Sequence, residues 1–197
     1  MSQWVRSDVT VACLNGLVAK GMLRPLTAAQ EWIVPRGEPA PVPPSGYVVF
    51  FVDFHEQSFA TPAHAFFRGL LHHYGVELQH LNPNGVQHVS AFIALCEGYL
   101  GVPPVFELWR YFFAASLIQS KVNGVPTSHR VGCASIHLRS GGDRCSQQYI
   151  EMGRLKASNK GWHASWFYLK NEEAVPLPGS PAGLWRKPPP PRSSAPG

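Results

Sequence analysis

The chain has 197 residues, of which 45% are hydrophobic and 15% are charged, so its composition is globular rather than disordered. That length suits one domain with a sizeable core. Apolar runs fall short of the roughly 18 residues that span a bilayer, and the first residues lack a signal-peptide pattern. We therefore expect an intracellular protein, cytoplasmic or nuclear, without a membrane partner.

The net charge of +5 is unevenly distributed along the chain. Residues 1–109 carry 5 basic and 8 acidic side chains, whereas residues 110–197 carry 12 basic and 4 acidic ones. A basic C-terminal half is compatible with a polyanionic partner, although scattered basic residues are also typical of a solvated surface.

The N-terminal quarter predicts short elements around a linker. A helix is expected at residues 8–20, with Asp8 as N-cap. Thr27 and Gln30 have the spacing of a capping box, which predicts a second, brief helix. Five prolines in residues 35–46 predict an extended linker, because proline is excluded from helix and sheet interiors. A β-prone run follows it at residues 47–53.

Three strongly apolar helices are predicted in the centre of the chain. Thr61-Pro62 and Asn82-Pro83 each combine an N-cap residue with proline at the first helical position. Gly75 ends the first of these helices, residues 101–104 break the second, and the third fades before Gly124. Each helix is too apolar to be stable alone, so the three are expected to pack together as the core.

The C-terminal third changes to a strand pattern. Residues 131–138 and 147–152 are expected to be strands joined at residues 140–143, and residues 163–169 form a third strand candidate. From residue 176 onward, proline, glycine, serine and arginine predominate.

These patterns predict an α+β fold, in which three to five helices form the core and a small antiparallel sheet lies in the C-terminal third. The expected divisions are N-terminal helices at 1–34, a Pro-rich linker at 35–46, a main domain at 47–175 and a Pro-rich disordered tail at 176–197.

No catalytic motif is recognisable, so we expect neither an enzyme nor a cofactor. The nearest approach to a metal site is His129, Cys133, His137 and Cys145. These residue types ligate zinc, but in a strand residues 133 and 137 would lie about 13 Å apart. The sequence therefore predicts no metal site.

One segment interleaves basic and aromatic residues in a way that suits single-stranded RNA or DNA. Cations would contact phosphates and the rings would stack on bases. Alternatively, the rings face one side of a strand and complete the core, and their exposure distinguishes the two interpretations. The candidate contact residues are Arg154, Lys156, Lys160, Trp162, Trp166, Tyr168 and Lys170.

Five stretches together resemble a known family. They are residues 23–32, GYVVFFVDFHEQSF at 46–59, residues 72–104, LWRYFF at 108–113 and SNKGWHASWFYLKN at 158–171. Over about residues 15–178, the chain resembles the gypsy-type transposon domain of plants, a gag-like N-terminal region of LTR-retrotransposon polyproteins.

The resemblance implies a non-enzymatic, retrotransposon-derived interaction or assembly domain of uncharacterised role. Its expected partners are a second copy or other element-encoded proteins, and no catalytic residues are carried over. An apolar or aromatic patch should then remain exposed on the folded monomer. The alternative function is a single-stranded nucleic-acid-binding module that uses residues 154–170.

Overall fold

A computed structural model describes residues 4–27, 31–117, 119–122, 125–128, 131–139, 149 and 159–171. The α-helices in these residues are α1 (Val11–Ala19), α2 (Val52–Glu56), α3 (Ala65–Tyr74), α4 (Pro83–Ala94) and α5 (Phe106–Phe112). The strands are β1 (Trp32–Ile33), β2 (Tyr47–Phe51), β3 (Phe113–Leu117), β4 (Gln119–Val122), β5 (Val125–Ser128), β6 (Ala134–Leu138) and β7 (Trp166–Lys170). Short 3-10 turns are η1 (Leu78–His80) and η3 (Trp162–Ala164), and the π-helix η2 (Leu95–Tyr99) continues α4.

The three-stranded sheet joins the two ends of the described chain. Its order is β1-β7-β2 and both pairings are antiparallel, with Phe50 opposite Phe167. The strand expected at residues 163–169 is present from Trp166 as β7, whereas residues 163–164 belong to the 3-10 turn η3. The partners of β7 come from the N-terminal part of the chain. Because β7 is central, its residues Trp166 to Leu169 are buried.

The second sheet differs from the expected pairing. The strand expected at residues 131–138 appears as β6, and it pairs with β3 instead of with residues 147–152. The third apolar helix correspondingly ends at Phe112, and Phe113 takes an extended conformation. Pairing with β6 gives the backbone of Phe113–Leu117 hydrogen-bond partners in place of those of a continued helix. Residues 147–152 and the joining turn at 140–143 lie outside the described residues, apart from the buried Tyr149.

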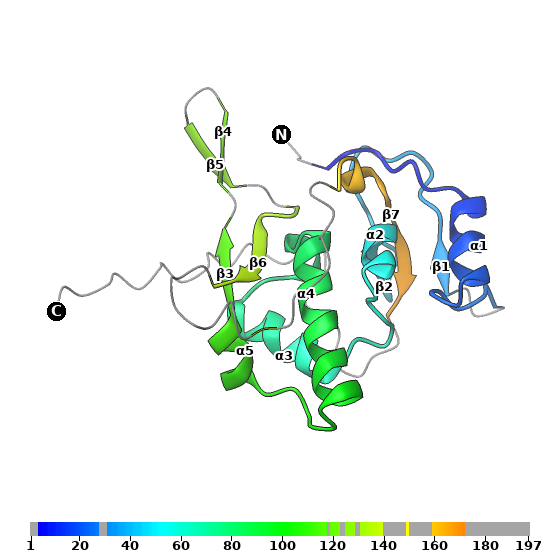
Figure 1. Ribbon diagram of the computed structural model, residues 1–197. Coiled ribbons are helices and arrows are strands. Elements are labelled where there is room, and N and C mark those ends of the chain that lie inside the picture. Colours follow the sequence, from blue (N-terminus) through cyan, green and yellow to red (C-terminus); the bar gives the residue numbers. More distant parts are fainter. Residues whose placement is uncertain are drawn as a thin grey trace.

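The helices and strands pack around one aromatic core, which confirms the α+β fold class. Trp109 stacks on Phe113 with ring centroids 4.2 Å apart, and Phe92 meets the face of Trp109 at 5.3 Å. Burying one such side chain contributes about 1.5–3 kcal/mol. Figure 1 shows α4 in the middle of the molecule, between the three-stranded sheet and the β3–β6 pair, with the β4–β5 hairpin projecting beyond it.

The helix boundaries test the capping predictions. Asn82 does cap α4, since its side chain accepts a hydrogen bond from the Gly85 amide, and Gly75 does end α3. Two other predictions were wrong. Thr10 rather than Asp8 caps α1, and His64 rather than Thr61 caps α3, which therefore begins at Ala65.

The N-terminal segment packs on the outer side of the three-stranded sheet. The Trp166 indole donates to the Val5 carbonyl at 2.7 Å, and the Asp8 amide donates to the Ala164 carbonyl at 2.9 Å. Residues 35–46 contain neither helix nor strand, and the Val42 amide donates to the Tyr168 hydroxyl. The brief helix expected after the Thr27–Gln30 capping box was wrong in its described part, because Trp32–Ile33 form strand β1 and pair with β7. Residues 28–30 and the expected disordered tail at 176–197 lie outside the described residues.

Candidate functional site

Three segments that are distant in sequence meet around a pocket of about 420 Å³. They are the start of α4, the turn before β6 and the turn that contains η3. The lining residues in the described part of the chain are Asn82, Pro83, Asn84, Val131, Gly132, Asn159, Lys160, Gly161, Trp162 and His163. Each of the three segments contributes one buried residue to this lining, namely Pro83, Val131 and Trp162.

Asparagine side chains form one wall of the pocket. Asn82 caps α4 through its contact with the Gly85 amide, at 2.7 Å. Asn159 donates its side-chain amide to the Asn84 side-chain oxygen at 2.9 Å, although 75 residues separate them in sequence. This bond ties the turn before η3 directly to the first turn of α4.

Gly132 permits the close approach that forms the opposite wall. Its φ is +68°, and a Cβ atom at this position would lie 2.5 Å from Cζ2 of Trp162. The Trp162 ring packs against two core rings, with its centroid 4.9 Å from that of Phe51 and 5.8 Å from that of Phe54. The Gly132 amide donates to the Gln79 carbonyl at 2.9 Å, which fixes the turn.

The charge at the pocket comes from Lys160. This side chain is exposed, and it is the only Lys, Arg, Asp or Glu among the described lining residues. His163 lies beside it, with its ring 4.1 Å from that of Trp162. The pocket therefore presents an ammonium group, an imidazole and several amides, a set suited to binding an anion.

The structure separates the predicted nucleic-acid contacts. Lys160 lies at the pocket rim, and Lys170 is half-buried at the end of β7. The rings of Trp162, Trp166 and Tyr168 are buried, so they belong to the core and are not available for base stacking. Trp166 and Tyr168 are covered because β7 is the central strand of its sheet, whereas Trp162 lies in η3 and packs on Phe51 and Phe54. Arg154 and Lys156 lie outside the described residues.

Sequence reasoning did not single out Gly132, Asn84, Asn159 or His163 as site residues. The Asn-Lys-Gly sequence at 159–161 is a turn signal, and Gly161 does have a positive φ of 86°. Nothing in the local sequence, however, indicates which segment that turn will face.

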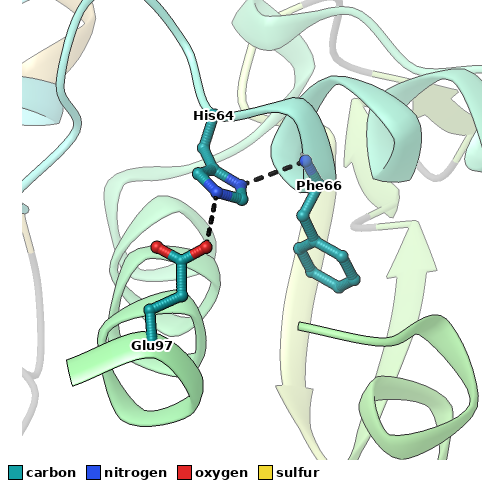
Figure 2. Close-up of polar contacts among 3 residues, drawn as sticks. All are labelled: His64, Phe66 and Glu97. Atoms are coloured by element: carbon teal, nitrogen blue, oxygen red, sulfur yellow. Dashed lines mark hydrogen bonds and ion pairs between the residues drawn. The ribbon is translucent and has the colours of Figure 1, made fainter. Parts of the chain in front are cut away.

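A second polar cluster joins α3 to the end of the α4–η2 helix (Figure 2). His64 Nδ1 accepts the Phe66 amide at 3.1 Å, and His64 Nε2 lies 3.0 Å from Glu97 Oε1. Because Nδ1 acts as an acceptor, the ring proton is on Nε2 and is donated to Glu97. The cluster thus caps a helix and holds the η2 π-helix against the start of α3.

Three other histidines, His55, His80 and His88, are buried within the core. Burial lowers the pKa of His55 and of His80 to about 4, and it also lowers the pKa of His88. His80 Nδ1 accepts the Glu77 amide at 2.9 Å, which requires an unprotonated Nδ1. These rings are therefore neutral at physiological pH.

Cys96 and Cys133 are buried in the core, whereas Cys13 is exposed. Burial raises the pKa of the Cys133 thiol to about 11, and it also raises the pKa of Cys96. Of the four residues considered as zinc ligands, His129 and Cys145 lie outside the described residues. Among the residues that the structure places, His, Cys, Asp and Glu side chains form no group of three that fits a metal ion.

An exposed apolar turn begins at the last two residues of the π-helix η2. Tyr99 is 86% exposed and Leu100 is 56% exposed, and Gly101 reverses the chain with a φ of +66°. Val102 and Val105 are also exposed. We call residues 98–105, Gly-Tyr-Leu-Gly-Val-Pro-Pro-Val, the apolar turn.

Comparison with known proteins connects part of the chain to a transposon family. Residues 48–117 match the model of a family described as "Putative gypsy type transposon". This segment runs from β2 to β3 and includes the apolar turn, the His64–Glu97 cluster and the asparagines at the start of α4. No curated protein and no solved structure matches the chain.

The match covers about a third of the chain, and it includes one of the three segments that line the pocket. It supports the resemblance stated from the sequence at the level of gypsy-type transposons. None of the helices in the described residues is long and apolar enough to cross a membrane.

Proposed function

We propose that this chain is a gag-like interaction domain derived from a plant retrotransposon, and that it works by self-association without catalysis. The similarity of residues 48–117 to a gypsy-type transposon family supports the origin. In this proposal the protein acts inside the cell, in the cytoplasm or nucleus, beside other element-encoded proteins.

The apolar turn is the observation that carries the proposal. It exposes large apolar side chains on the folded monomer, and residues 98–105 contain no charged or hydrogen-bonding side chain other than the Tyr99 hydroxyl. A contiguous exposed apolar segment is typical of a contact surface rather than of a solvated loop.

A second copy of the chain is the occupant that this surface fits. A two-fold symmetric contact places the same patch on both sides of the interface, so one apolar patch is sufficient to form it. Tyr99 supplies an aromatic anchor of the kind that dominates interface energetics. Glu97, the nearest carboxylate before the turn in sequence, is paired with His64 at 3.0 Å.

The test compares the self-association of the wild-type protein with that of two variants by sedimentation velocity over a range of concentrations. We expect the wild type to dimerise and the double variant Tyr99→Ser, Leu100→Ser to weaken dimerisation about a hundredfold, since each lost contact costs about 1–2 kcal/mol. The control is Val42→Ser, because Val42 is also exposed but lies in the Pro-rich segment. A wild type that stays monomeric at every concentration would refute the proposal.

The alternative, a single-stranded nucleic-acid-binding module, has weaker support. Its aromatic residues are buried in the described fold, and of its cations Lys160 is exposed at the pocket. Binding would then depend on phosphate contacts alone, and its affinity would fall steeply with salt.

A further inference from the structure

The pocket beside α4 is separate from the apolar turn and calls for its own explanation. The pocket lies at the N-terminal end of α4, whereas the apolar turn begins at the last two residues of η2, at the other end of the same continuous helix. A helix of this length separates its ends by more than about 20 Å. Self-association through the turn therefore leaves the pocket accessible.

The size of the pocket indicates a small-molecule ligand. Its volume of about 420 Å³ falls within the range of about 300–1,000 Å³ that is typical of ligand sites. A lone inorganic ion would fill only a fraction of that space, whereas a nucleotide would occupy most of it.

The lining chemistry indicates that the ligand is anionic. Lys160 contributes a positive charge, and the described lining residues include no carboxylate that would repel an anion. The side-chain amide of Asn159 and the imidazole of His163 add hydrogen-bonding groups within the same lining. Charge-assisted hydrogen bonds to phosphate oxygens suit such a set.

The walls are held in place before any ligand arrives. The Asn159–Asn84 hydrogen bond fixes one side, and the packing of Trp162 against Gly132 fixes the other. A preorganised site loses less conformational entropy on binding than a flexible one. This rigidity distinguishes the pocket from an exposed basic loop.

We propose that this pocket binds the phosphate group of a nucleotide-sized ligand, with Lys160 as its main anion contact. The phosphate belongs either to a free nucleotide or to one unit of a single-stranded nucleic acid, and the two sources share the same chemistry at Lys160.

The experiment follows amide resonances of the full chain by NMR during titration at constant ionic strength. The probes are adenosine 5′-monophosphate, inorganic phosphate and adenosine. We expect saturable shifts at Gly132 and at residues 159–163 with the first two probes, and much weaker shifts with adenosine. A short single-stranded oligothymidylate distinguishes the sources: tighter binding than the monophosphate indicates nucleic acid, and weaker binding indicates a free nucleotide.

Three lysine variants, two at Lys160 and one at Lys20, give the matched comparison. Lys160→Ala should weaken monophosphate affinity about tenfold, which corresponds to one charge-assisted hydrogen bond, and Lys160→Arg should restore most of it. Lys20→Ala, at an exposed lysine after α1 that does not line the pocket, should change affinity less than about twofold. Equal losses in both alanine variants, equal affinity for adenosine, or no saturable shift at these residues would each overturn the proposal.

Discussion

At the scale of single residues, Gly132 shows how one missing methyl group shapes the pocket. The left-handed backbone at this position disfavours every side chain, and the Trp162 ring occupies the space that a Cβ would need. Both effects act together, because the turn and the ring are each anchored elsewhere in the core.

We predict that Gly132→Ala destabilises the protein by about 2–4 kcal/mol. The left-handed conformation accounts for about 1–2 kcal/mol, and overpacking against Trp162 accounts for the remainder. Urea unfolding measured by tryptophan fluorescence gives the free-energy difference.

The control is Gly16→Ala, within α1, where a new Cβ would meet nothing within 4 Å. There we expect a stabilisation of up to about 1 kcal/mol, because alanine has the higher helix propensity. If the two variants changed stability equally, the close packing of Gly132 on Trp162 would have no energetic importance.

Residue-level signals in the sequence succeed where the interaction is local. Asn82 caps α4 through an amide three residues away, so a short sequence window contains both partners. The Gly132–Trp162 contact joins residues thirty positions apart, and the sequence of either segment gives no indication of the other. The sequence can therefore indicate the turns that line the pocket, but it cannot indicate which turns come together.

At the scale of elements, the start of α3 depends on a histidine in place of the usual capping residue. His64 performs the cap and also contacts Glu97 on η2, so a single side chain links two helices. The sequence predicted Thr61 as the cap because Thr-Pro is the stronger local signal. The tertiary contact with Glu97 favours His64 instead.

We predict that His64→Ala destabilises the protein by about 1–2 kcal/mol, because the cap and the contact are both lost. His64→Asn should recover most of the loss, because asparagine is a good N-cap. The remaining difference reflects the contact with Glu97, which the shorter asparagine side chain cannot make. Thermal unfolding by circular dichroism distinguishes the two variants. Equal destabilisation by alanine and asparagine would mean that the capping hydrogen bond contributes little.

Strand pairing is the part of the fold that element-level patterns could not assign. The strand-like composition of residues 131–138 and 163–169 predicted a strand in each, and the structure has strands there at Ala134–Leu138 and Trp166–Lys170. However, β6 pairs with β3, and β7 pairs with both β1 and β2, all of which come from earlier segments. Periodicity reports which face of a strand is apolar, and it carries no information about the neighbour to which that strand bonds.

At the scale of the whole molecule, the buried histidines couple folding to pH. The folded state keeps His55 and His80 neutral with pKa values of about 4, whereas the unfolded chain has the ordinary value near 6.5. Above pH 6.5 both histidines are neutral in the folded and the unfolded state, so their burial carries no protonation cost. As the pH falls from 6.5 towards 4, protonation of the unfolded chain lowers the free energy of unfolding.

We predict that the free energy of unfolding falls by about 3 kcal/mol for each of these two histidines between pH 7 and pH 4, at about 1.4 kcal/mol per pKa unit. Burial raises the pKa of Glu77, which offsets part of the loss at the acidic end because the folded state favours its protonated form. Denaturant unfolding at a series of pH values measures the effect.

The variant His55→Gln isolates one of these contributions, because glutamine is neutral and its amide can still donate towards the Phe59 carbonyl that His55 contacts. Its stability should vary less steeply with pH than that of the wild type. A parallel pH dependence in the two proteins would show that His55 protonation is not linked to unfolding.

The central position of β7 also sets the order of events when the chain is synthesised. Neither β1 nor β2 has a sheet partner until Trp166–Lys170 has left the ribosome, more than a hundred residues after Ile33. At typical translation rates this interval is on the order of ten seconds. The nascent chain must therefore carry the apolar β2 strand with an open edge throughout that time, and a chain that ends before Trp166 would lack the strand that completes this sheet.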